Sequence, residues 1–220
     1  MLNKAETTVT NMETAVFNNP TKTPHFESSV PEHGSVLAGP VINVVINFNF
    51  DLAKNSSISI KRSAQEFGQG ELVLDSNKLS MRRAMDSGAP DGTYTVTYQA
   101  CWPDKSCHQG SFQFAVTRSK QDDFKDQTNR KEITLDLLNS SFEPENIRIS
   151  KGTKITWVNK DVVEHYINTD PHPGHNYYKD QNSKLLKTNE SYSLVFTKSG
   201  LYPYHCSAHA DYMTGNILVD

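Results

Sequence analysis

Near its C-terminal end the 220-residue chain reads His205-Cys206-Ser-Ala-His209-Ala-Asp-Tyr-Met213-Thr-Gly215. Within this run Cys206, His209 and Met213 offer a thiolate, an imidazole and a thioether. Such soft and borderline donors suit copper that cycles between Cu(I) and Cu(II). His205 precedes Cys206 in an extended run, where successive side chains point to opposite faces, so we expect it not to bind the same metal. The spacing therefore predicts a copper-binding loop.

A second imidazole has to come from elsewhere in the chain. The candidate is His165, at the end of the run Trp157-Val-Asn-Lys-Asp161-Val-Val-Glu-His165, just after a strand-like segment and a polar turn. Two imidazoles, one thiolate and a weak axial Met make the trigonal type 1 copper site. Structural zinc sites prefer closed Cys/His sets, and a Cys–His nucleophile would need an open cleft beside its thiolate. We therefore expect one copper per chain, and no catalysis by the protein itself.

Both halves of the chain alternate apolar and polar residues, with turn signals between the short runs. Such runs stand at 41–50, 57–62, 70–74, 93–98, 110–116, 133–137, 153–158, 191–196 and 215–219. This pattern predicts an all-β protein built from two tandem Greek-key domains, each a β-sandwich or barrel. The predicted divisions are a disordered arm or tether over 1–24, a first domain over 25–117, a charged linker over 118–131 and a second domain over 132–220.

Composition excludes several classes of protein. The formal net charge is -3, which argues against a generally basic nucleic-acid binder. No apolar run approaches the length of a membrane span, and the first residues lack the pattern of a signal peptide. Either the protein is cytoplasmic, or a secretion signal or anchor lies outside this sequence.

Cysteine usage distinguishes these two locations. Cys101 and Cys107 stand close together in CWPDKSC, whereas Cys206 is alone. This arrangement predicts one short disulfide and one thiol kept for chemistry, with three reduced cysteines as the alternative. A disulfide places the protein in an oxidising compartment, so we expect a periplasmic or extracellular location.

The second half also resembles a known family. It shows Phe142-x-Pro144, Gly152-x-x-Ile-Thr-Trp157-x-Asn159-x-Asp161, then His165, Gly200-x-Tyr-x-Tyr-His-Cys206-x-x-His209 and Met213-x-Gly215. Residues 132–220 are therefore similar to a cupredoxin, the blue-copper fold of plastocyanin and amicyanin. The resemblance implies that His165, Cys206 and His209 are the equatorial copper ligands and that Met213 is the axial one. Two features differ: the gap between His209 and Met213 is intermediate between amicyanin-like and plastocyanin-like loops, and Tyr166 stands where a small polar residue usually ties the ligand loops together.

The first half resembles a different copper-binding family. The run from His25 to Pro40, the strand-like Gly92-Thr-Tyr94-Thr-Val-Thr-Tyr98 and the segment Gly110–Val116 follow the order seen in CopC proteins, which are periplasmic copper-binding β-barrels of immunoglobulin type. The family's Cu(II) site uses a free N-terminal His, whereas His25 here follows 24 residues. A purely structural domain is one reading, and a weak second metal site using His25, His33 or His108 is the other.

Together these features predict an extracytoplasmic copper protein that transfers one electron at a time at a type 1 site. Its partner would be a redox protein or a copper-trafficking protein. We expect it to bind no nucleic acid and to contain no membrane span, and its N-terminal segment could serve as a tether. The alternatives are copper storage, delivery or resistance, and an adhesive or structural β-sandwich without metal. We expect His172 and His175 to lie on a loop at the rim of the copper site, where they touch a partner. A second metal site formed by these histidines is the less favoured alternative.

Overall fold

Several strands of the fold alternate buried and exposed residues. In strand β11 (Glu132–Leu138), for example, Ile133, Leu135 and Leu137 are buried while Glu132 and Thr134 face solvent. The computed structural model describes residues 15–220, and residues 1–14 of the predicted arm lie outside the described residues. Among the described residues no helix is long and apolar enough to cross a bilayer. The all-β prediction is confirmed.

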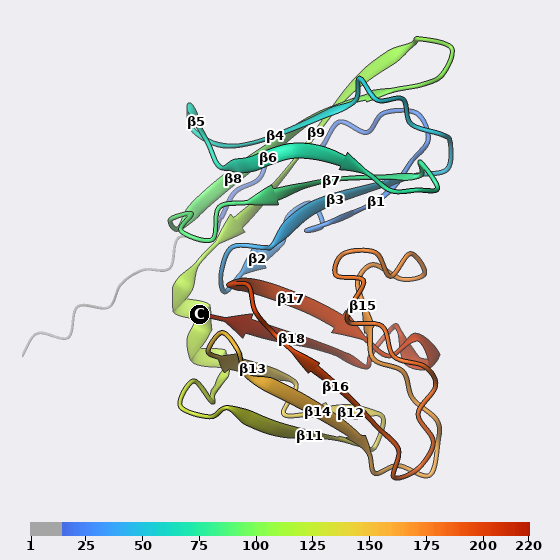
Figure 1. Ribbon diagram of the computed structural model, residues 1–220. Helices are drawn as coiled ribbons and strands as arrows, with labels where there is room; N and C mark the ends of the chain where they lie inside the picture. Colours follow the sequence, from blue (N-terminus) through green and yellow to red (C-terminus); the bar gives the residue numbers. More distant parts are fainter. Residues whose placement is uncertain (1–14) are drawn as a thin grey trace, which may run out of the picture.

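The first half of the chain forms a sandwich of two sheets (Figure 1). One sheet has the order β1-β3-β7-β6 and the other β2-β9-β8-β4-β5. The strands are β1 (Phe26–Val30), β2 (Val36–Leu37), β3 (Asn43–Phe48), β4 (Ser57–Arg62), β5 (Gln65–Glu66), β6 (Gly68–Leu74), β7 (Ser80–Met85), β8 (Gly92–Cys101) and β9 (Cys107–Val116). Before β1, Thr21 forms an antiparallel bridge with Ser111 of β9.

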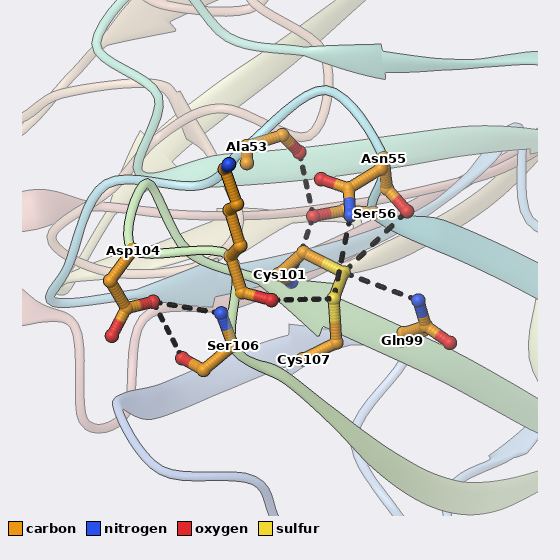
Figure 2. Close-up of a disulfide and its surroundings, with 9 residues drawn as sticks. Ala53, Asn55, Ser56, Gln99, Cys101, Asp104, Ser106 and Cys107 are labelled. Carbon is orange, nitrogen blue, oxygen red and sulfur yellow. Dashed lines mark hydrogen bonds between the residues drawn. A yellow bond between two sulfur atoms is a disulfide. The ribbon is translucent and has the colours of Figure 1, made fainter.

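The disulfide joins the two longest strands of this sandwich. Cys101 and Cys107 face each other across the β8–β9 hairpin, with their Cα atoms 4.1 Å apart. Figure 2 shows the bridge among polar neighbours, where Asn55 and Gln99 donate side-chain hydrogen bonds to its two sulfurs at 3.4 and 3.2 Å. The predicted disulfide is thus present, and Cys206 is the free cysteine of the described residues.

The second half forms another two-sheet sandwich, with orders β10-β13-β18-β17-β15 and β12-β11-β14-β16. Besides β11, its strands are β10 (Lys125–Asp126), β12 (Ser141–Glu143), β13 (Asn146–Ile149), β14 (Lys154–Asn159), β15 (Asn168–Thr169), β16 (Ser191–Val195), β17 (Gly200–His205) and β18 (Thr214–Val219). Two short 3-10 helices complete the fold, η1 (Arg118–Asp123) and η2 (Ser207–His209). In the segment predicted as a linker, η1 and β10 are ordered, and β10 pairs with β13.

The two sandwiches are in direct contact. Val41 forms a parallel bridge with Leu201 of β17, and Figure 1 shows β17 on the side of the second sandwich that faces the first. The fully buried hydroxyl of Tyr177 accepts a hydrogen bond from the Ile42 amide at 2.8 Å and donates one to the Leu201 carbonyl at 2.6 Å. The loop that carries Tyr177 is therefore fastened to both sandwiches.

Candidate metal centre

The Cys206 loop is closed by its own backbone. Strand β17 ends at His205, and η2 turns the chain immediately after Cys206. The Cys206 amide donates to the Met213 carbonyl at 2.9 Å, and the Met213 amide donates to the His209 carbonyl at 2.9 Å. These bonds hold the three predicted ligands of the loop at one end of the sandwich.

His165 reaches the same end from a different loop, which follows β14. Asn159, the last residue of β14, is fully buried and its side-chain amide donates to the carbonyls of Val163 and Leu186 at 2.8 and 2.9 Å. His165 itself pairs with Leu186 in an antiparallel bridge. The loop backbone is therefore fixed on both sides of the imidazole.

The predicted equatorial donors converge on one point. The Sγ atom of Cys206 lies 3.6 Å from Nδ1 of His165 and 3.6 Å from Nδ1 of His209. With bonds of about 2.3 Å to sulfur and about 2.0–2.1 Å to nitrogen, a metal at tetrahedral to trigonal angles separates these donors by about 3.6–3.8 Å. The donor set and the spacing therefore fit copper, whose type 1 sites use two His and one Cys.

Asp161 orients the His165 ring. One carboxylate oxygen of Asp161 lies 2.9 Å from Nε2 of His165, and the carboxylate also accepts the amides of Asn139 and Ser140 at 3.0 and 2.7 Å. Burial alone would raise the pKa of Asp161, but these hydrogen bonds outweigh it and the pKa is lowered. An ionised carboxylate accepts only, so Nε2 carries the proton and Nδ1 keeps its lone pair for the metal.

The sulfur has one further neighbour. Cys206 is fully buried, and the backbone amide of Tyr166 donates to its Sγ at 3.3 Å. Tyr166 was not expected to connect the two ligand loops through its side chain. Ser207 and Asn168 connect them instead, because the Ser207 hydroxyl donates to the Asn168 side chain at 2.9 Å. The sequence alone did not reveal the hydrogen bond of Asp161 to His165 or that of Ser207 to Asn168. Its one indication of the former was the position of Asp161, four residues before His165.

Met213, the proposed axial ligand, is buried. Its side chain is 1% exposed, whereas His209 is half-buried and the neighbouring Tyr212 is 65% exposed. The imidazole of His209 and the ring of Tyr212 have their centroids 5.5 Å apart. One edge of the candidate centre thus reaches solvent while its remaining donors are buried.

The three histidines considered for the first sandwich do not assemble in this way. Among residues 15–220, His25, His33 and His108 belong to no group of three or more metal-binding side chains. His25 contacts Asn49 and stacks on Phe50, and His33 accepts the Gln113 amide. A weak metal site there remains a prediction.

A second group of donors forms beside the first. His172, His175 and His205 place their nitrogen atoms within 4.8 Å of one another. His205 directs its ring away from the Cys206 cluster, as the alternation of an extended strand requires. Burial, followed by the nearby imidazoles of His205 and His172, lowers the pKa of His175 to about 4, so that ring is neutral at pH 7.

Each half of the chain matches the model of a known copper-binding family, as its sequence predicted. Residues 129–220 match the family of copper binding proteins described as plastocyanin/azurin, and residues 26–117 match the CopC domain. Together with the donor set above, these matches make copper the cofactor. The two matches are separated by the segment 118–128, which begins with η1.

Two curated relatives of the chain are amicyanins. Amicyanin-alpha of Methylorubrum extorquens is 32% identical over 79 residues, which is 36% of this chain and 64% of the relative. Amicyanin of Paracoccus denitrificans is 28% identical over 88 residues, 40% of this chain and 65% of the relative. The chain therefore spans just under two thirds of the length of these relatives.

Among solved structures, the described chain is similar to a reduced amicyanin at 26% identity, covering 40% of this chain and 82% of that one with a TM-score of 0.35. It is also similar to a purple cupredoxin from Nitrosopumilus maritimus at 29% identity, covering 40% and 98% with a TM-score of 0.35.

Proposed function

We propose that this protein is an extracytoplasmic copper protein that carries single electrons at a type 1 site, because residues 129–220 match the plastocyanin/azurin family of copper binding proteins and residues 26–117 match the CopC domain. The observation that supports this most directly is the equal 3.6 Å spacing from Cys206 Sγ to the two histidine nitrogens. The disulfide between Cys101 and Cys107 supports the oxidising location.

The protein's contribution is a cage that changes little between oxidation states. When bound, copper supplies the one-electron exchange. Asp161 fixes the His165 ring, the Tyr166 amide donates to the thiolate, and the backbone bonds of Met213 hold the loop. A hydrogen bond to the sulfur draws electron density from it and favours the reduced metal. Ligands that do not rearrange keep the reorganisation energy small, so electron exchange is fast.

The exposed edge of the centre is the proposed contact for a redox partner. His209 is half-buried and Tyr212 next to it is 65% exposed, whereas Cys206 and His165 are fully buried. Electrons would therefore enter and leave past His209. The protein acts in this scheme as a carrier and not as an enzyme.

Copper storage or delivery is the second candidate, and the CopC domain favours it. The two functions differ in the metal environment they need. A carrier holds copper tightly through both oxidation states, whereas a delivery protein has to release it to an acceptor.

The optical spectrum of the Cu(II)-loaded full chain distinguishes them. A thiolate–copper charge-transfer band gives an intense visible colour, so we expect a strongly coloured protein and complete loss of the band in Cys206→Ser. The control is Ser57→Ala, which removes a hydroxyl from an exposed residue of β4 in the first sandwich and leaves all four proposed ligands in place. A pale wild-type protein would favour storage or delivery, and a coloured Cys206→Ser variant would refute the assigned thiolate.

A further inference from the structure

We propose that His172, His175 and His205 form a second transition-metal site, which takes a divalent ion of borderline softness, Cu(II) in preference to Zn(II). The three imidazoles bring their nitrogen atoms within 4.8 Å of one another. Imidazole binds both ions, and among divalent first-row metals copper forms the most stable complexes with a given donor set. The site is separate from the one that contains Cys206.

The closest pair of donors already has the spacing of metal ligands. Nε2 of His175 lies 3.2 Å from Nε2 of His205. At metal–nitrogen distances of about 2.0–2.1 Å, two donors of a tetrahedral site stand about 3.3 Å apart. The ring centroids of the three imidazoles are separated by 5.1 to 5.4 Å, so the rings surround a common point.

A carboxylate sets the tautomer of the buried ligand. His205 is 2% exposed, and its Nδ1 lies 2.6 Å from a carboxylate oxygen of Asp170. When Nδ1–H donates to this carboxylate, Nε2 presents its lone pair to the other two rings. This carboxylate–histidine arrangement is the one that supports metal-bound imidazoles in proteins.

In the absence of metal the same atoms form a hydrogen-bond chain. With the lone pair of His205 Nε2 facing it, the single Nε2–H of His175 can donate either to His205 or to the Ser207 hydroxyl, which lies 3.0 Å away. That chain needs one proton at this position, and a metal ion would replace it. His172 takes no part in this hydrogen-bond chain, because its ring makes no hydrogen bond to another described residue. With a metal bound, it would be the third ligand.

The loop that carries His172 and His175 is held by the first sandwich. The side-chain amide of Asn176 donates to Asn47 and Ser80, each at 2.7 Å, and Tyr177 next to it bonds to Ile42. Both anchors directly follow His175. The first sandwich therefore holds in place a loop of the second sandwich that carries two of the proposed ligands, His172 and His175.

The site opens onto a cleft between the two sandwiches. This cleft has a volume of about 420 Å³ and is lined by Asp170, His172 and His205 on one side and by Ser28 and Glu32 on the other. Three protein ligands leave a coordination position free, and the cleft gives metal and water a path to it.

Copper stoichiometry of the untagged full chain tests the proposal. After one equivalent has developed the visible band of the Cys206 site, a second equivalent of Cu(II) should bind without adding to that band, because its ligands include no thiolate. Its EPR spectrum should show nitrogen hyperfine coupling. His172→Ala and His175→Gln should each weaken this second binding at least about tenfold, and Asp170→Asn about 10–100-fold.

Two controls make the result specific. His108→Ala removes an exposed histidine of the first sandwich and should leave the second copper unchanged. Cys206→Ser should abolish the visible band and keep the second copper, so failure of this proposal is distinct from failure of the electron-carrier function. Retention of the visible band shows that the His172 and His175 variants are folded.

A stoichiometry of one copper per chain would show that the histidines form a hydrogen-bond chain only. A second copper that persists in His172→Ala and His175→Gln would place it elsewhere, and its loss in His108→Ala would place it in the first sandwich. Each of these results overturns the proposal.

Discussion

Replacing Asp161 by Asn tests how His165, a proposed copper ligand, is oriented. The carboxylate of Asp161 accepts three hydrogen bonds, from the Asn139 amide, from the Ser140 amide and from Nε2 of His165. An Asn side chain has one acceptor oxygen and one donor nitrogen. If its nitrogen faces His165, the ring proton is driven to Nδ1, which is the atom 3.6 Å from the Cys206 sulfur. If its oxygen faces His165, its NH2 group points at the backbone N–H of Asn139, and the two donors repel each other.

Either arrangement disturbs the ring that the metal needs. Loss of such an outer hydrogen-bond partner lowers metal affinity about 10–100-fold in known sites. This corresponds to about 1.4–2.7 kcal/mol of binding free energy. The assay is a competition titration of Asp161→Asn against a chelator of known copper affinity, with the visible band recorded in parallel. We expect weaker binding and a shifted band.

The matched control is Asp211→Asn, which removes the same charge from an exposed residue of the loop between His209 and Met213. It should bind copper within about twofold of wild type, because an exposed charge is screened by water and salt. Equal losses in the two variants would mean that net charge matters and orientation does not. Wild-type affinity in Asp161→Asn would refute the role of the carboxylate altogether.

Three further outcomes are expected. Met213→Gln should keep copper bound while lowering its reduction potential, measured by voltammetry, because a weak axial thioether favours Cu(I); a potential equal to wild type would mean that Met213 is not an axial ligand. Thiol titration of the unfolded, metal-free, non-reduced protein should find one free thiol, from Cys206, whereas three would contradict the disulfide. Tyr177→Phe should lower the free energy of unfolding in urea by about 1–3 kcal/mol, because it leaves the buried amide of Ile42 without a partner; an unchanged midpoint would show that water or a backbone shift replaces the hydroxyl.

Local spacing was enough to predict three of the four proposed ligands of the candidate centre. Cys206, His209 and Met213 lie within one short loop, and a turn of that length can bring its own residues together whatever surrounds it. The disulfide was equally local, because Cys101 and Cys107 close a single hairpin. Alternation of apolar residues established the all-β class for the same reason, since each strand shows its buried face in its own sequence.

Contacts between segments far apart in the chain could not be found in this way. The bonds of Tyr177 to Ile42, of Asn176 to Asn47 and of Ser207 to Asn168 join residues whose neighbours in sequence carry no sign of the partner. The segment predicted as a linker contains η1, from which the Gln121 side chain donates to the Ala38 carbonyl, and β10, which pairs with β13.

The histidine cluster shows the division most clearly. Alternation along β17 predicted that His205 would turn away from the Cys206 metal, but it could not say what His205 would meet. The loop from Asp170 to His175 has no periodicity, so its path depends on the anchors that Asn176 and Tyr177 make to the other domain. The proposed donors and the alternation of strand residues can both be predicted from local sequence. Which of these donors meet could be seen only in the folded chain, because their meeting depends on how the two sandwiches pack against each other.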